Sequence, residues 1–238
     1  MIKTVWLDNP PVNAVNAAII ETLWNEFEAL DDDVRVVVLR GKGDRAFSAG
    51  ADITGFVGGG SDGERPAGIQ PAANLIESVD VPVIAAIHGY CLGGGLEIAL
   101  ACDFRVAHRD AQLGFPEVNL GLLPGGGGTQ RAPRLISPGR ARWLTMSGER
   151  IDAPTAERWG LVEFVVDDLD EGITRYAEPL TRQSPHALGQ IKRLMHATRD
   201  QRDDELEVRA FVECLHSDDG QEGVAAFLEK REAHWTGR

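Results

Sequence analysis

The sequence predicts an α/β fold with a mostly parallel sheet, followed by a helical C-terminal part. Short apolar segments rich in β-branched residues, such as 34–40 and 81–87, alternate with segments of helical periodicity. This alternation is typical of parallel strands joined by helical crossovers. Beyond about Gly139 the patterns are mainly helical. A chain of 238 residues is long enough to bury a sizeable core.

The elements follow from apolar periodicity and from the glycines, prolines and capping residues that punctuate it. The expected strands are 2–7, 34–40, 81–87, 104–107 and 162–166. The expected helices are 14–30 (with Asn13 as its cap), 72–78, 95–102, 140–146, 153–159, 172–182, 186–198, 203–216 and 221–232. Residues 47–50 are interpreted as loop, and the glycine-rich segment 58–68 as a flexible loop.

Composition argues against several partners and locations. The net charge of −13 opposes binding to polyanions, so we expect no nucleic-acid partner. The three cysteines form no Cys-x-x-Cys pair and are expected to be free thiols in a reducing compartment. The N-terminal residues lack the apolar core of a signal peptide, and no run of about 20 apolar residues is present. These features predict a cytoplasmic protein without a membrane span.

Several common site motifs are absent or incomplete. Residues 41–46 fit the dinucleotide pattern G-x-G-x-x-A, but no helix is expected to start there. The chain contains no phosphate-binding loop of the G-x-x-x-x-G-K-[ST] type and no G-x-S-x-G elbow. The six histidines form no H-x-x-x-H pair, so the sequence suggests no metal site. His88 is expected to be structural.

Glu97 is the only formally charged residue between Asp80 and Asp103, in a chain that is 26% charged. It follows the three glycines 93–95, where a helix is expected to begin. Amide groups in the first turn of a helix have no intrahelical partner, and glycine allows another group to approach the backbone closely. The segment therefore predicts a donor site for a developing negative charge beside a carboxylate. A simple interaction of Glu97 with the helix dipole is the alternative interpretation.

Glu117 repeats this pattern, since it is the only charged residue between Asp110 and Arg131 and precedes the glycines 125–128. Buried carboxylates are costly unless they are hydrogen-bonded or protonated. Two such groups that meet in the fold can hold different protonation states and divide acid and base work. The turn 48–53 could supply a further backbone amide.

The motifs at these positions resemble the enoyl-CoA hydratase/isomerase (crotonase) family. The matching segments span almost the whole chain and are FSAGADI (47–53), PVIAAIHGYCLGGGLE (82–97), GFPE (114–117), LPGGGGTQR (123–131), GERIDA (148–153), GLV (160–162) and EGVAAFLEKR (222–231). The resemblance implies a crotonase-like (ClpP/crotonase) spiral of ββα units. Residues 1–185 would form its α/β core, and residues 186–238 a C-terminal helical trimerisation or lid region of the same domain. It also implies an acyl-CoA substrate, no separate cofactor, and a homo-oligomer that is a trimer or a dimer of trimers.

The resemblance also implies roles for particular residues. The amides of Ala51 and Gly94 would hold the thioester oxygen, and Glu97 and Glu117 would flank a water molecule. We expect Glu97 to hold the water and act as base, and Glu117 to be the main proton donor, although the sequence leaves this assignment open. Further residues expected to line the coenzyme A channel are Ala14, Ala49, Asp52 and Ile53.

Three functions follow from this resemblance in decreasing order of support. The first is an enoyl-CoA hydratase that reversibly adds water, in syn fashion, to a trans-2-enoyl-CoA, because both glutamates are present. The second is another acyl-CoA enzyme of the family: an isomerase, a dehydratase, or a hydrolase or lyase. The third is a non-catalytic assembly or RNA-associated protein, which the net charge of −13 and the two glutamates disfavour.

Overall fold

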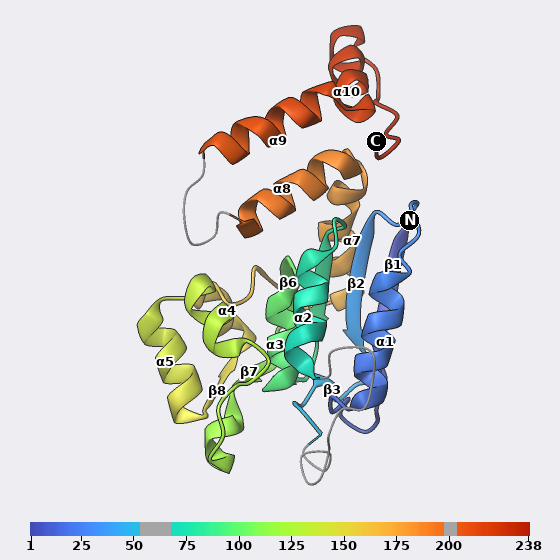
Figure 1. The fold of residues 1–238 in the computed structure, drawn as a ribbon. Coiled ribbons are helices and arrows are strands. Elements are labelled where there is room, and N and C mark those ends of the chain that lie inside the picture. The colour runs from blue at the N-terminus through green and yellow to red at the C-terminus, as the bar shows by residue number, and fades with distance from the viewer. Residues whose placement is uncertain (53–67, 198–203) are drawn as a thin grey trace.

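The fold contains two β-sheets with helices packed around them, as seen in a computed structural model that describes residues 1–52, 68–197 and 204–238 (Figure 1). The larger sheet is entirely parallel. Its strands, in the order in which they lie side by side, are β1 (Ile2–Leu7), β2 (Val36–Gly41), β4 (Val83–Ile87), β6 (Phe104–His108) and β9 (Phe164–Val166). The predicted strands are all confirmed, with ends shifted by up to two residues.

The central strands β2, β4 and β6 of the larger sheet are mostly buried on both faces, which explains why they read as nearly continuous apolar runs. Successive side chains of β2 point to opposite faces. Val37 and Leu39 join the main core, which includes residues of α1 (Ala17–Glu28), α2 (Ile69–Ser78) and α3 (Gly94–Ala101). Val36 and Val38 join a second cluster with Leu169 and Ala177 of α7 (Leu169–Thr181).

The smaller sheet was not predicted. Its strands are β3 (Ala46–Ser48), β5 (Tyr90–Leu92), β7 (Gln112–Gly114) and β8 (Arg150–Asp152), side by side in that order. Each has three residues, too few for an alternating pattern to be recognised. The interpretation of residues 47–50 as loop was therefore wrong for 47 and 48, because parallel pairing of β3 with β5 extends the backbone there.

The helices alternate with these strands and then dominate the C-terminal part. They are α1 (Ala17–Glu28), α2 (Ile69–Ser78), α3 (Gly94–Ala101), α4 (Gly128–Leu135), α5 (Pro138–Ser147), α6 (Ala153–Trp159), α7 (Leu169–Thr181), α8 (Pro185–Ala197), α9 (Asp204–His216) and α10 (Asp218–Glu229), with a 3₁₀ turn η2 at Pro116–Leu120. Of these, α4 and η2 were not predicted.

The first helix begins later than expected, and its predicted cap was wrong. Asn16 caps α1, because its side chain accepts a hydrogen bond from the amide of Ile19 at 3.0 Å. Asn13 is buried instead, and its side-chain amide donates to the carbonyls of Lys42 and Ala46. Asn13 thus fixes the turn before α1 against the start of β3.

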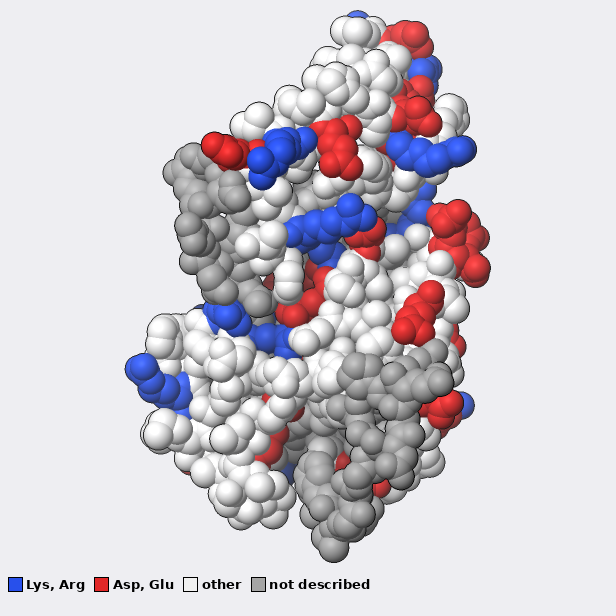
Figure 2. Space-filling model, viewed as in Figure 1, with Lys and Arg blue, Asp and Glu red and all other residues white. Residues whose placement is uncertain are grey.

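The C-terminal helices α8, α9 and α10 lie at one end of the molecule, away from α4 and α5 (Figure 1). They expose several large apolar side chains, and acidic and basic side chains lie interspersed over this end on the face drawn in Figure 2. The division into 1–185 and 186–238 stays a prediction. Among the described residues, no helix combines the length and apolar character needed to cross a membrane. The predicted loop 58–68 lies outside the described residues except for Gly68.

Candidate active site

The N-terminus of α3 is formed by a glycine turn that packs against the smaller sheet. Gly93 precedes the helix with φ 49° and ψ −125°, a backbone conformation that residues with side chains rarely adopt. Its amide donates to the carbonyl of Gly114 in β7 at 2.9 Å, and its carbonyl accepts from the amide of Glu97 at 2.9 Å. A Cβ on Gly95 would lie 2.6 Å from the carbonyl oxygen of Ser48. The glycines therefore allow α3 to begin directly against β3 and β7.

Glu97 lies in the first turn of α3 and is 2% exposed. Its Oε1 accepts two backbone hydrogen bonds, from the amides of Gly126 at 2.7 Å and Gly128 at 2.8 Å. Burial raises the pKa of this carboxyl, while the amides of the glycine turn and the positive charge of Arg131 oppose the rise. The amides and Arg131 thus offset part of the cost of ionising a buried carboxyl group, while its pKa stays above the usual value.

Glu117 lies in η2, and its carboxyl group is close to Gly93 in the glycine turn before α3. A Cβ on Gly93 would lie 2.8 Å from Glu117 Oε1. The other oxygen, Oε2, is buried and has no hydrogen-bond partner among the described residues. Burial raises the pKa of Glu117 to about 7, and the negative charge of Glu97 adds to the rise. Glu117 therefore exchanges a proton near neutral pH.

The backbone of Ala51 lies close to Gly94, the first residue of α3. Ala51 forms a parallel bridge with Val15, in which the amide of Val15 donates to Gly50 and that of Asp52 donates to Val15, both at 2.8 Å. These bonds use the groups on either side of Ala51, so the amide of Ala51 itself faces the opposite direction. A Cβ on Gly94 would lie 3.4 Å from the Ala51 nitrogen. As the first residue of α3, Gly94 has an amide without an intrahelical partner.

The other predicted binding residues lie beside Ala51. Ala49 donates its amide to the carbonyl of Val12 at 2.9 Å, and the bridge with Val15 brings Asp52 alongside the same segment. Ala14 lies between these two contacts and is half-buried. Ile53 lies outside the described residues. The structure thus brings together Ala14, Ala49, Ala51 and Asp52, with Gly94 facing Ala51.

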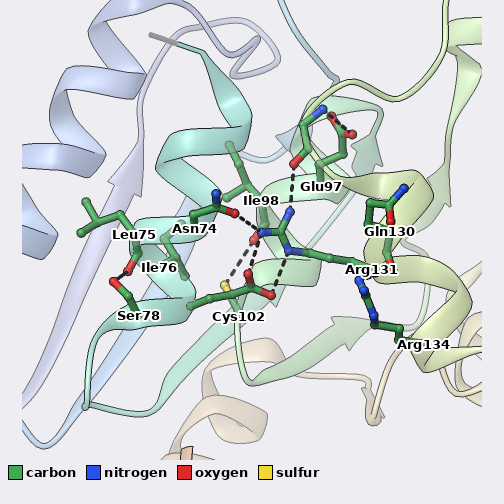
Figure 3. A network of polar contacts seen from close by, with 12 residues as sticks. Asn74, Leu75, Ile76, Ser78, Glu97, Ile98, Cys102, Gln130, Arg131 and Arg134 are labelled. Carbon is green, nitrogen blue, oxygen red and sulfur yellow. Dashed lines mark hydrogen bonds and ion pairs between the residues drawn. The ribbon is translucent and has the colours of Figure 1, made fainter. Parts of the chain in front are cut away.

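Two side chains at the site were not singled out from the sequence. Arg131 of α4 is buried and lies between Asn74 of α2 and Glu97 of α3 (Figure 3). The side chain of Ile69, the first residue of α2, lies close to both Gly94 and Gly126. A Cβ on Gly94 would collide with it, and a Cβ on Gly126 would lie 2.5 Å from it. Arg131 had one recognisable signal, since it is the first charged residue after the long stretch that contains only Glu117.

The cysteines are free, and the two in the core are poor nucleophiles. Cys91 and Cys102 are buried, and burial raises the pKa of Cys91 well above its usual range and that of Cys102 to about 12. Burial lowers the pKa of His88, whose Nε2 has no hydrogen-bond partner among the described residues. Within the described part of the chain, no three His, Cys, Asp or Glu side chains gather in a way that could hold a metal ion.

Comparison with known proteins assigns the family. The sequence model described as Enoyl-CoA hydratase/isomerase matches residues 1–238. The chain belongs to the enoyl-CoA hydratase/isomerase family. It is 39% identical to a probable enoyl-CoA hydratase of Bacillus subtilis (strain 168), with 99% of this chain and 95% of the relative covered. It is 36% identical to a carnitinyl-CoA dehydratase of Salmonella heidelberg (strain SL476), with 100% and 95% covered.

The enoyl-CoA hydratase/isomerase fold is confirmed by solved structures. The crystal structure of an enoyl-CoA hydratase from Bacillus anthracis superposes with a TM-score of 0.92 at 38% identity, covering 100% of this chain and 96% of that one. The predicted crotonase-like α/β fold is therefore correct. The two relatives differ in the reactions that their names describe, so the family does not by itself decide this chain's reaction.

Proposed function

We propose that this chain is an enoyl-CoA hydratase that adds water reversibly to a trans-2-enoyl-CoA thioester. The observation that carries the proposal is the pairing of two unlike carboxyl groups at one helix N-terminus. Glu97 accepts two amide hydrogen bonds, whereas Glu117 has a buried oxygen without a partner among the described residues. Such a pair is suited to act as base and acid in one reaction.

The amides of Ala51 and Gly94 are proposed to hold the thioester oxygen. When water attacks C3 of the enoyl group, electrons move through the conjugated system and negative charge grows on that oxygen. Two preorganised amides in a water-poor site stabilise this charge, and loss of one such donor typically lowers the rate by ~10²–10³-fold. The proposal is supported by the 3.4 Å that would separate a Cβ on Gly94 from the Ala51 nitrogen.

The two glutamates are proposed to move the protons. Glu97 takes a proton from the attacking water, whose oxygen forms the new bond to C3. Glu117 gives its proton to C2, on the same face in a syn addition, as the enolate returns its electrons. One water is consumed, and the two carboxyl groups together neither gain nor lose a proton. A pKa of about 7 for Glu117 supports its role as the donor at neutral pH.

The test is the hydration of crotonyl-CoA, followed as loss of the ultraviolet absorbance of the enoyl thioester. We expect turnover by the wild-type protein and none above background in the double variant Glu97→Gln, Glu117→Gln. The matched control is Glu178→Gln, which changes an exposed glutamate of α7 and should leave turnover unchanged. Full activity in the double variant would refute the assigned chemistry, and inactivity of the folded wild type would refute the reaction.

A second candidate is dehydration of another hydroxyacyl-CoA, which the relatedness to a carnitinyl-CoA dehydratase favours. The chemistry is the reverse of hydration and uses the same amides and carboxyl groups. A panel of hydroxyacyl-CoA thioesters separates the two, because a dedicated dehydratase would prefer one substituted substrate over 3-hydroxybutyryl-CoA.

We also propose that the coenzyme A channel is lined by Ala14, Ala49, Ala51 and Asp52. The proposed reaction needs no cofactor besides the coenzyme A that the substrate carries. We further propose a cytoplasmic homo-oligomer, a trimer or a dimer of trimers, because α9 and α10 expose apolar side chains such as Phe211 and Phe227. Light scattering of the purified protein tests the assembly, and a monomeric mass would contradict it.

A further inference from the structure

Arg131 is a buried cation whose side chain donates hydrogen bonds to two segments of the chain. Its Nη1 donates to the carbonyl of Gly126 at 2.9 Å. The other two guanidinium nitrogens face α2. There Nε and Nη2 donate to the carboxylate of Glu77 at 3.0 and 2.7 Å, and Nη2 also donates to Asn74 Oδ1 at 2.8 Å. The side chain of Arg131 is 7% exposed and that of Glu77 is 15% exposed. The planar guanidinium therefore links α2 to the glycine turn before α4.

That glycine turn is the one that binds Glu97. The residue Gly126 is held on both sides, because its amide donates to Glu97 Oε1 at 2.7 Å and its carbonyl accepts from Arg131. Two residues later, the amide of Gly128 donates to the same oxygen at 2.8 Å. Arg131 and Glu97 thus hydrogen-bond to opposite ends of Gly126.

The shape of the turn is adapted to both charged groups. Gly127 has φ 108°, and a Cβ there would collide with Nη1 of Arg131. A Cβ on Gly126 would lie 2.5 Å from Glu97 Oε2. Only glycines leave room for the guanidinium on one side and the carboxylate on the other.

From this arrangement we propose that Arg131 is a positioning residue, which holds the Gly126 carbonyl so that the amides of Gly126 and Gly128 aim at Glu97 Oε1. The orientation of the carboxylate then depends on α2, through the contacts of Glu77 and Asn74 with Arg131. The catalytic meaning of this orientation rests on the proposed function, whereas the link between Arg131 and Glu97 does not.

The first experiment replaces the link without leaving a buried charge alone. The double variant Arg131→Met, Glu77→Gln removes both members of the ion pair. The single variant Arg131→Lys keeps a positive charge but loses the planar guanidinium group and its several donors. The matched control is Arg105→Lys. Arg105 is also buried, donates to the carbonyls of Ala99 and Cys102, and pairs with Glu163, but it holds the other end of α3.

With crotonyl-CoA as substrate, both Arg131 variants should lower kcat by ~10–100-fold, as expected for a displaced catalytic group, with KM changed by less than about threefold. The acidic limb of the kcat/KM profile should move to higher pH in both variants, because the amide donors to Glu97 lose their alignment; the double variant also removes the positive charge of Arg131. Arg105→Lys should lower thermal stability without moving that limb. An unmoved limb in folded Arg131 variants would overturn the proposal.

An infrared titration tests the link without any substrate. The band of the protonated Glu97 carboxyl is identified as the one that Glu97→Gln removes, and its midpoint is followed with pH. The proposal expects a higher midpoint in both Arg131 variants and the wild-type midpoint in Arg105→Lys. Equal midpoints in wild type and both Arg131 variants would refute the positioning role. A shifted midpoint in a protein that does not hydrate crotonyl-CoA would keep the role and reject only the proposed reaction.

Discussion

The carboxyl groups of Glu97 and Glu117 lie in different surroundings within the candidate site. Glu97 accepts two hydrogen bonds at one carboxylate oxygen from the amides of Gly126 and Gly128, and the buried Arg131 donates to the carbonyl of Gly126. The segment around Glu117 buries one carboxylate oxygen without giving it a partner among the described residues. Burial raises the pKa of both carboxyl groups. At Glu97 the amides and Arg131 oppose the rise, whereas at Glu117 the negative charge of Glu97 adds to it and the pKa reaches about 7. The proposed division into a base and an acid rests on this difference.

The largest effect is expected from removing either carboxyl group. Glu97→Gln and Glu117→Gln keep the shape of each side chain but remove its capacity to exchange a proton. Each should lower kcat for crotonyl-CoA hydration by ~10²–10⁴-fold, the usual contribution of general acid–base catalysis. Steady-state kinetics with purified, folded variants checks this. A loss below about tenfold in either variant would mean that Glu97 and Glu117 do not act as a base and acid pair.

A smaller loss is expected when the space between the two amides is filled. In Gly94→Ala the new methyl group would collide with Ile69 and lie 3.4 Å from the Ala51 nitrogen, where the thioester oxygen is proposed to bind. We expect kcat/KM to fall by ~10²–10³-fold. Gly139→Ala is the matched control, because a Cβ there meets nothing within 4 Å. Equal activity in the two variants would show that the thioester oxygen does not bind beside Gly94.

The pH dependence of turnover separates the two carboxyl groups directly. In the hydration direction Glu117 must be protonated, and its pKa is about 7. The value of kcat/KM should therefore fall above about pH 7, by about tenfold for each further pH unit. A profile that stays level to about pH 9 would contradict the assignment of Glu117 as the acid.

The smallest effect is on stability. The folded state raises the pKa of Glu117 from 4.5 to about 7, so its stabilising contribution is complete below the lower value and is lost as pH rises through the higher one. Relative to Glu117→Gln, the wild type should lose about 1–2 kcal/mol of unfolding free energy between about pH 5 and about pH 8, after allowance for solvent screening at this half-buried site. Urea unfolding of both proteins at the two pH values measures the difference. A constant difference would show that the fold does not perturb Glu117.

Glu97 and Glu117 could be predicted as site residues from the sequence, because each is the single charged residue in a long uncharged stretch. The strands of the larger sheet were also predictable, since burial of its central strands on both faces produces continuous apolar runs. The three-residue strands of the smaller sheet, such as β3, carry no periodicity that can be recognised, whereas the equally short β9 lies within a longer, mostly apolar segment. The partners of Arg131 could not be predicted for a different reason: Glu77 lies 54 residues away in the chain, and the packing of both α2 and α4 against α3 brings the two together.

The most direct test of the account is a crystal structure of the Glu117→Gln variant with crotonyl-CoA bound. The account predicts that the thioester oxygen lies within hydrogen-bonding distance of the amides of Ala51 and Gly94, with C3 facing Glu97. A thioester oxygen bound away from either amide, or an enoyl group that faces neither carboxyl side chain, would contradict it.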